Sequence, residues 1–103
     1  QTDMILSGGA NIYPAEVEAA IDSCAGVRSS AVIGLPHEDL GNFVHAIVDA
    51  PGGLEEAALL SHLSERLVRY KIPRTIEFSD EPLRDDAGKL RRKALREERL
   101  DKS

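Results

Sequence analysis

The fold is decided by residues 28–49, RSSAVIGLPHEDLGNFVHAIVD, which contain two apolar segments on either side of a short polar turn. Residues 28–35 and residues 43–49 each have the length and the apolar content of one strand, and therefore predict two strands. The turn between them runs from Pro36 to Gly41. Because the connection is so short, we expect the two strands to be antiparallel.

Helices and short strands are predicted on both sides of this pair. Residues 3–13 predict two extended pieces around the loop Ser7-Gly8-Gly9, as in a β-hairpin. Residues 54–70 give the clearest helical pattern, since their leucines recur on one face. The remaining elements are a helix that starts at Pro14 and stops near Gly26, a third strand over 74–79 and a charged helix over 91–100.

The order of these elements predicts an α+β domain. It suits a small sheet of about three strands with helices packed on it, preceded by a short N-terminal β-hairpin. Residues 1–103 suffice for one domain. Hydrophobic residues make up 42% of the chain and aromatic residues only 4%, so aliphatic side chains must build the core.

Charge and composition exclude several function classes. The net charge of −5 argues against general nucleic-acid binding, which depends on a basic surface. No apolar run approaches the roughly 20 residues of a membrane span, and no signal peptide is visible. Cys24 is the only cysteine, which excludes an internal disulfide and predicts a buried thiol in a reducing cytoplasm. His37, His45 and His62 are too scattered to form a metal site.

Lys89 is the first candidate for chemistry, because it directly follows Gly88 in residues 82–95, PLRDDAGKLRRKAL. A turn built by Asp85, Asp86 and Gly88 would hold one ammonium group at the tip of a loop. A cation in such a place suits a phosphate or carboxylate that is contacted and then released. The alternative is a solvated lysine after a turn. The arginines and lysines that follow predict a solvated helix face: Arg91, Arg92, Lys93, Arg96 and Arg99.

Two further groups are candidates for binding. Gly8 and Gly9 let a backbone pass close to a ligand, although paired glycines also occur in any tight turn. Near the end of the predicted helix over 54–70, an aromatic ring could stack on a base and neighbouring cations could meet phosphates. The same cations could instead complement the helix dipole, and both interpretations remain open. This third group consists of Arg69, Tyr70, Lys71 and Arg74.

Taken together with VIGLP (residues 32–36) and RYKIPR (residues 69–74), the glycine segment and the Gly88-Lys89 pair resemble one family over nearly the whole chain. It is the small C-terminal domain of the adenylate-forming, or AMP-binding, superfamily, which includes acyl-CoA synthetases, peptide-synthetase adenylation domains and luciferases. The resemblance is strongest to the acyl-CoA synthetases, also called acid–CoA ligases.

The resemblance implies a role for each candidate group. Lys89 would contact the substrate carboxylate and the oxygens near the α-phosphate of ATP during adenylation. After a domain rotation, Gly8 and Gly9 would line the tunnel for the pantetheine thiol of CoA. The nucleotide part of CoA would lie near Tyr70, Lys71 and Arg74, and the hinge between the domains would fall on Thr2 and Asp3.

The implied function is that of a mobile lid domain of an ATP-dependent acid–CoA ligase. ATP and CoA would serve the full enzyme, and Mg²⁺ would accompany ATP without being bound by this domain. The partners would be the enzyme's own large N-terminal domain, expected upstream of Gln1, and a small carboxylic acid. We expect the isolated fragment to be inactive. The alternatives are a peptide-synthetase domain that serves a carrier protein, a non-catalytic interaction module and a stand-alone anion-binding domain.

Two segments depart from the pattern of this family. Thr2 stands where the hinge usually carries an acidic residue or lysine. Asp85, Asp86 and Ala87 replace a threonine-rich stretch before the Gly-Lys pair. We expect the two carboxylates to attract the ammonium group of Lys89 and to raise the repulsion toward a triphosphate.

Overall fold

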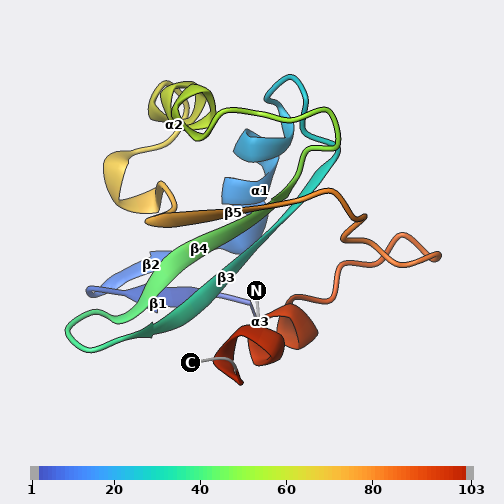
Figure 1. Cartoon of the computed structure of the whole chain (residues 1–103). Helices are drawn as coiled ribbons and strands as arrows, with labels where there is room; N and C mark the ends of the chain where they lie inside the picture. Colours follow the sequence, from blue (N-terminus) through green and yellow to red (C-terminus); the bar gives the residue numbers. More distant parts are fainter. Residues whose placement is uncertain (1–2, 102–103) are drawn as a thin grey trace.

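The computed structural model describes residues 3–101 and, within them, confirms the predicted α+β fold: a two-stranded hairpin, a three-stranded sheet and three α-helices (Figure 1). The elements are, in chain order, β1 (Ile5–Ser7), β2 (Ala10–Ile12), α1 (Pro14–Asp22), β3 (Ser29–His37), β4 (Gly41–Asp49), α2 (Glu56–Ser64), the 3₁₀ helix η1 (Arg69–Lys71), β5 (Thr75–Ser79) and α3 (Arg92–Leu100).

The three-stranded sheet has the strand order β3-β4-β5. As predicted, β3 and β4 are antiparallel, and they pair from Ser29 with Asp49 to His37 with Gly41. Both strands are longer than expected, because the pairing continues past Pro36 into the turn. Proline is tolerated there since β3 is an edge strand. β5 is parallel to β4, which requires a crossover, and α2 lies in that connection.

The sheet is buried on both of its faces. α1 lies against one face with α2 beside it, and α3 lies against the other face (Figure 1). Alternate residues of the strands therefore enter two different clusters. The larger cluster includes Ile12, Val17, Ile21, Val32, Val48, Leu59 and Leu63. The smaller one consists of Ala31, Ile33 and Ile47, with Leu83, Leu90 and Leu95 among the side chains packed against it.

The predicted helix over 54–70 is too long. α2 ends at Ser64, and the chain then turns into η1. Leu67 is partly buried against the larger cluster, but it reaches the cluster from the turn, and Ile72 packs there as well. Leucine periodicity continued past the helix because the turn also contributes to the core, so the pattern alone could not locate the end of α2.

α1 also ends earlier than predicted, at Asp22 instead of near Gly26. Cys24 is a buried free thiol, as expected, but it belongs to the turn after the helix. Gly26 has a φ angle of +96° and continues this turn.

Arg92 of α3 forms ion pairs with two carboxylates elsewhere in the domain, those of Glu18 and Asp3. Its Nε and Nη2 atoms donate to the carboxylate of Glu18 at 2.7 and 2.5 Å, and its Nη1 atom donates to Asp3 at 2.6 Å. The side chain of Glu18 is only 7% exposed, and its carboxylate also accepts the backbone N–H of Val32 at 2.8 Å. Glu18 raises the pKa of the Arg92 guanidinium. A buried carboxylate on α1 is thus neutralised by an arginine 74 residues later.

Two more arginines of α3 face the sheet. Arg96 Nε donates to the carbonyl oxygen of Gly34 at 2.6 Å. Arg99 donates to both carboxylate oxygens of Glu77 at 2.8 and 2.6 Å, and Glu77 also contacts the ring of His45 at 3.0 Å. The prediction of a solvated basic face is therefore wrong for Arg92, Arg96 and Arg99. α3 therefore packs on the sheet with Leu95 and bonds to it through Arg96 and Arg99.

Replacing Arg92 by methionine should destabilise the domain. The Glu18 carboxylate would stay buried without its counter-ion, and such a loss costs about 3 kcal/mol. Urea unfolding of the chain measures the free energy of unfolding directly. The matched control is Lys93→Met, which removes an exposed cation from the next position and should change stability by about 0.5 kcal/mol or less. Equal effects of the two substitutions would contradict the structural role of Arg92.

The ion pair between Glu77 and Arg99 should make the free energy of unfolding depend on pH. Arg99, with a smaller contribution from His45, lowers the pKa of Glu77 from 4.5 to about 2. Because the folded-state pKa is the lower one, this stabilisation is complete above the unfolded-state pKa and is lost as the pH falls toward the folded-state pKa. The difference in unfolding free energy between the parent and Glu77→Gln should therefore be constant near neutral pH and shrink at acidic pH. A difference that stays constant to about pH 3 would refute this assignment.

Candidate functional site

The paired glycines form the two-residue turn between β1 and β2. Gly8 has a φ angle of +57° and Gly9 one of +85°. A two-residue hairpin turn of type I′ needs positive φ at both central positions, which glycine adopts without strain. The Gly8 N–H donates to the carbonyl oxygen of Leu40 at 2.9 Å, which ties the hairpin to the β3–β4 turn. The hairpin geometry alone is therefore sufficient to favour glycine here, with or without a ligand.

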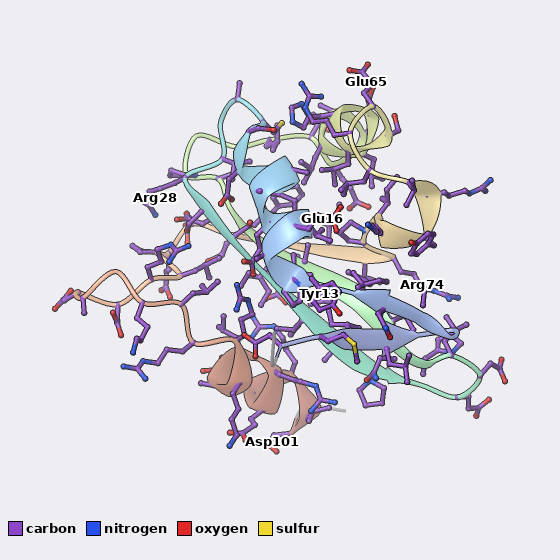
Figure 2. All side chains as sticks on the ribbon, turned by 180° about the vertical axis from the view of Figure 1, so that it is seen from behind. Tyr13, Glu16, Arg28, Glu65, Arg74 and Asp101 are labelled. Carbon is purple, nitrogen blue, oxygen red and sulfur yellow. The ribbon has the colours of Figure 1, made fainter. Side chains whose placement is uncertain are left out.

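An open groove runs beside this turn. Its lining includes Ser7 and Gly8 from the hairpin, Phe43 from β4, and the region of η1 with Arg69, Tyr70 and Arg74. The fold thus brings the predicted glycine loop together with three of the four members of the predicted third group, Arg69, Tyr70 and Arg74. Tyr70 is 58% exposed, and among residues 3–101 neither Arg69 nor Arg74 is within ion-pair distance of a carboxylate. Figure 2 shows Arg74 on the side of the molecule toward which the hairpin extends.

Lys71, the remaining member that sequence reasoning assigned to a CoA contact, has a partner within the domain. Its ammonium group donates to both carboxylate oxygens of Glu16 at 2.9 and 3.0 Å, and this pairing raises the pKa of Lys71. It also lies 5.9 Å from the centre of the Tyr70 ring. Lys71 therefore fastens η1 to α1 and does not line the groove.

Lys89 is presented by a short hairpin-like loop. Arg84 and Leu90 form an isolated antiparallel bridge, and the Asp85 N–H donates to the Lys89 carbonyl oxygen at 3.0 Å. Gly88 has a φ angle of +79°, and its N–H donates to the Asp85 carbonyl oxygen at 2.8 Å. This is a turn closed by a glycine in the left-handed conformation. The loop projects from the body of the domain (the orange segment in Figure 1).

The ammonium group of Lys89 is free to meet a ligand. Lys89 is exposed, and no carboxylate of residues 3–101 lies within ion-pair distance of it. The backbone of the loop is nevertheless anchored, because Leu83 and Leu90 on its two sides pack against the smaller core cluster. The flexible side chain of Lys89 thus extends from a loop whose backbone is fixed.

The carboxylate of Asp85 forms no ion pair with the Lys89 ammonium group and is engaged elsewhere. Its Oδ1 atom accepts the backbone N–H groups of Ala87 and Lys89 at 3.0 and 2.9 Å, and its Oδ2 atom accepts from Arg91 Nε at 3.1 Å. These contacts, the N–H of Lys89 first among them, lower the pKa of Asp85. Sequence reasoning missed this role, although aspartate is known to bond the backbone two residues ahead in turns.

The predicted hinge is described only in part. Thr2 lies outside the described residues, whereas Asp3 is exposed and bonded to Arg92. Asp3 and Lys89 border one depression, together with Arg91 and Lys93. The structure therefore brings the hinge position and the lysine loop to one region, separate from the groove beside Gly8.

The two candidate sites lie at opposite sides of the domain. The β1–β2 turn and the loop that carries Lys89 point away from each other in both views (Figures 1 and 2). The domain measures 35 × 31 × 26 Å. One reaction centre could therefore meet Lys89 or the glycine turn, but not both in the same orientation of this domain.

Residues 3–101 show neither a membrane-spanning helix nor a metal site. Within residues 3–101, no helix has the length and apolar character to cross a bilayer. Over the same residues, no group of three or more His, Cys, Asp and Glu side chains is arranged to hold a metal ion.

Comparison with protein families identifies a match that covers most of the chain. A family model described as the AMP-binding enzyme C-terminal domain matches residues 16–89, which is well over half of the chain.

Curated relatives of the chain are CoA ligases. A long-chain-fatty-acid–CoA ligase from Mycobacterium tuberculosis is 42% identical over 97 residues, which cover 93% of this chain and 19% of that protein. A 2-succinylbenzoate–CoA ligase from Geobacillus kaustophilus is 43% identical over 98 residues, which cover 93% of this chain and 20% of that protein. The chain thus spans about a fifth of the length of these relatives.

Solved structures agree with the fold. The fatty acyl CoA synthetase of Mycobacterium tuberculosis has a TM-score of 0.89 and 40% identity over 98% of this chain and 20% of its own. ATP-bound MatB from Rhodopseudomonas palustris has a TM-score of 0.86 and 40% identity over 96% of this chain and 20% of its own.

Proposed function

Because the chain belongs to the family of AMP-binding enzyme C-terminal domains, we propose that it is the mobile C-terminal domain of an ATP-dependent acid–CoA ligase. The full enzyme would convert a carboxylic acid and ATP into an acyl-adenylate and then pass the acyl group to CoA. The observation that carries the proposal is the placement of two exposed candidate sites at opposite sides of one small domain. Each site would serve one of the two half-reactions.

Lys89 is the residue we assign to adenylation. Negative charge shifts between the attacking carboxylate and the departing pyrophosphate, and a cation placed nearby lowers the energy of that charge in a water-poor site. The ammonium group is exposed, without an ion-pair partner in the described residues, and carried on an anchored loop, all of which suit this task. It acts as a point charge and hydrogen-bond donor, so it must stay protonated.

The groove beside Gly8 is the site we assign to CoA. The exposed ring of Tyr70 suits stacking on a base, and the guanidinium groups of Arg69 and Arg74 suit phosphates. Gly8 and Gly9 add no side chain where the pantetheine arm would pass. Lys71 contributes indirectly, since its pairing with Glu16 holds η1 in place. The relatives described above are CoA ligases, which favours CoA over a carrier protein as the acceptor.

The change between the two half-reactions would be a rotation of this domain against the large N-terminal domain. Such conformational steps commonly gate two-step enzymes. The hinge would lie at Thr2 and Asp3. The acid pocket and most ATP contacts, including those of Mg²⁺, would belong to the large domain, so the present chain alone would be inactive.

Lys89→Ala in the full-length enzyme is the test of the adenylation role. Pyrophosphate release should fall roughly 100-fold or more, because a charge contact of the transition state is lost. Thioester formation from supplied acyl-adenylate and CoA should keep its rate. Lys93→Ala, which removes a cation bordering the same depression, should leave both rates near those of the parent. If Lys89→Ala leaves both half-reactions intact, the adenylation role is wrong, and the result supports the alternative of a non-catalytic interaction module.

Gly8→Asn tests the assignment of the groove. Asparagine tolerates the left-handed backbone and is favoured in this type of turn, so the hairpin should survive. The new Cβ atom would lie 3.1 Å from the flexible end of Leu40, which can shift. With the full-length enzyme, we expect the thioester half-reaction to fall at least about 10-fold while adenylation holds.

The control for this substitution is Gly52→Asn, at a loop position where an added Cβ atom meets nothing within 4 Å. It should leave both half-reactions unchanged. Normal thioester formation by Gly8→Asn, with the hairpin intact, would reduce the glycine pair to a purely structural turn.

A further inference from the structure

The placement of the Lys89 ammonium group depends on the backbone beneath it. A lysine side chain has four rotatable bonds, and among residues 3–101 no carboxylate pairs with this one. The domain can therefore direct the ammonium group only by fixing the position and direction of the Lys89 main chain. Whatever holds that main chain determines where the cation is offered.

A single residue holds both polar groups of the Lys89 main chain. The Lys89 N–H donates to Asp85 Oδ1 at 2.9 Å, and the Lys89 carbonyl oxygen accepts the Asp85 N–H at 3.0 Å. The same Oδ1 atom also accepts the N–H of Ala87 at 3.0 Å. Asp85 thus closes the loop from the inside, across the turn that ends at Gly88.

The second carboxylate oxygen of Asp85 bonds to a residue that follows the loop. Asp85 Oδ2 accepts from Arg91 Nε at 3.1 Å, so one carboxylate bridges residues 89 and 91 on the two sides of Leu90. Leu90 packs against the smaller core cluster. The loop is therefore connected through Asp85 to the part of the chain that enters α3.

We propose that Asp85 is a positioning residue for Lys89, whose carboxylate fixes the backbone from which the ammonium group is presented. This inference rests on the proposed adenylation role of Lys89. Asp85 does not touch the substrate. It acts by removing freedom from the loop before the loop enters the active site of the large domain, so that less ordering is needed there.

The neighbouring Asp86 provides a matched control. It carries the same charge one position later and is exposed, and no hydrogen bond or ion pair of its side chain is present among the described residues. Asp86→Ala changes the charge near Lys89 as Asp85→Ala does, but leaves the loop contacts in place. Asp85→Asn is the conservative variant, since its amide oxygen can still accept the two backbone N–H groups.

The experiment uses the full-length enzyme and measures pyrophosphate release and thioester formation separately. Asp85→Ala should lower the kcat of adenylation roughly 10- to 100-fold, with little change in the KM for ATP and no loss of thioester formation from supplied adenylate. Asp85→Asn should recover most of this loss, and Asp86→Ala should retain the parent rates. Added to Lys89→Ala, the Asp85→Ala change should cause no further loss, because it acts through the lysine.

Other results would contradict either the positioning role of Asp85 or the proposed function itself. Equal rates for Asp85→Ala and Asp86→Ala, or a further loss on top of Lys89→Ala, would overturn the positioning role. If Asp85→Ala slowed both half-reactions equally, Asp85 would serve the general stability of the domain, and the positioning role would be overturned as well. If Lys89→Ala itself adenylates normally, the proposed function fails and not only this inference.

Discussion

The buried ion pair between Glu18 and Arg92 is the interaction on which the arrangement of this domain depends. The β3–β4 pair is apolar on both faces, so it needs a cover on each. α1 and α2 cover one face with aliphatic side chains. α3 covers the other face with Leu95, and its arginines bond to Glu18 of α1, to the carbonyl oxygen of Gly34 and to Glu77 of β5. Both layers thus bury apolar side chains against the sheet, and the layer of α3 adds ion pairs to these contacts.

This ionic attachment bears on function because the lysine loop leads directly into α3. Leu83 and Leu90 anchor the two sides of the loop, and Asp85 ties its turn to Arg91 at the start of the helix. The groove at the other side of the domain is built differently, from a hairpin turn and a 3₁₀ helix pinned by Lys71 and Glu16. Two exposed sites are thus carried by one rigid frame, which suits a domain that offers them in alternation.

Local patterns in the sequence were sufficient for the class and order of the elements. The hairpin at Gly8-Gly9 and the strands around residues 31–33 and 44–48 have short-range signatures, and the structure contains them. The end of α2 was missed because Leu67 extends the helical period from a turn. The roles of Arg92, Arg96 and Arg99 were missed because their partners lie far away in the sequence, and no local pattern marks such pairs. The Gly88 turn was foreseen, but not that Asp85 bonds the backbone.

The long sequence separation of Glu18 and Arg92 has a consequence for synthesis on the ribosome. Domains are generally completed as the chain emerges, from the N-terminal side onward. Until α3 has left the exit tunnel, the carboxylate on α1 has no counter-ion, and the apolar patch of Ala31, Ile33 and Ile47 stays open to solvent. The nascent domain therefore exposes these apolar side chains of β3 and β4 until the segment that ends in α3 has been translated. Leu83 and Leu90 beside the lysine loop and Leu95 of α3 then cover that surface together, so the loop becomes anchored at the step that buries the patch.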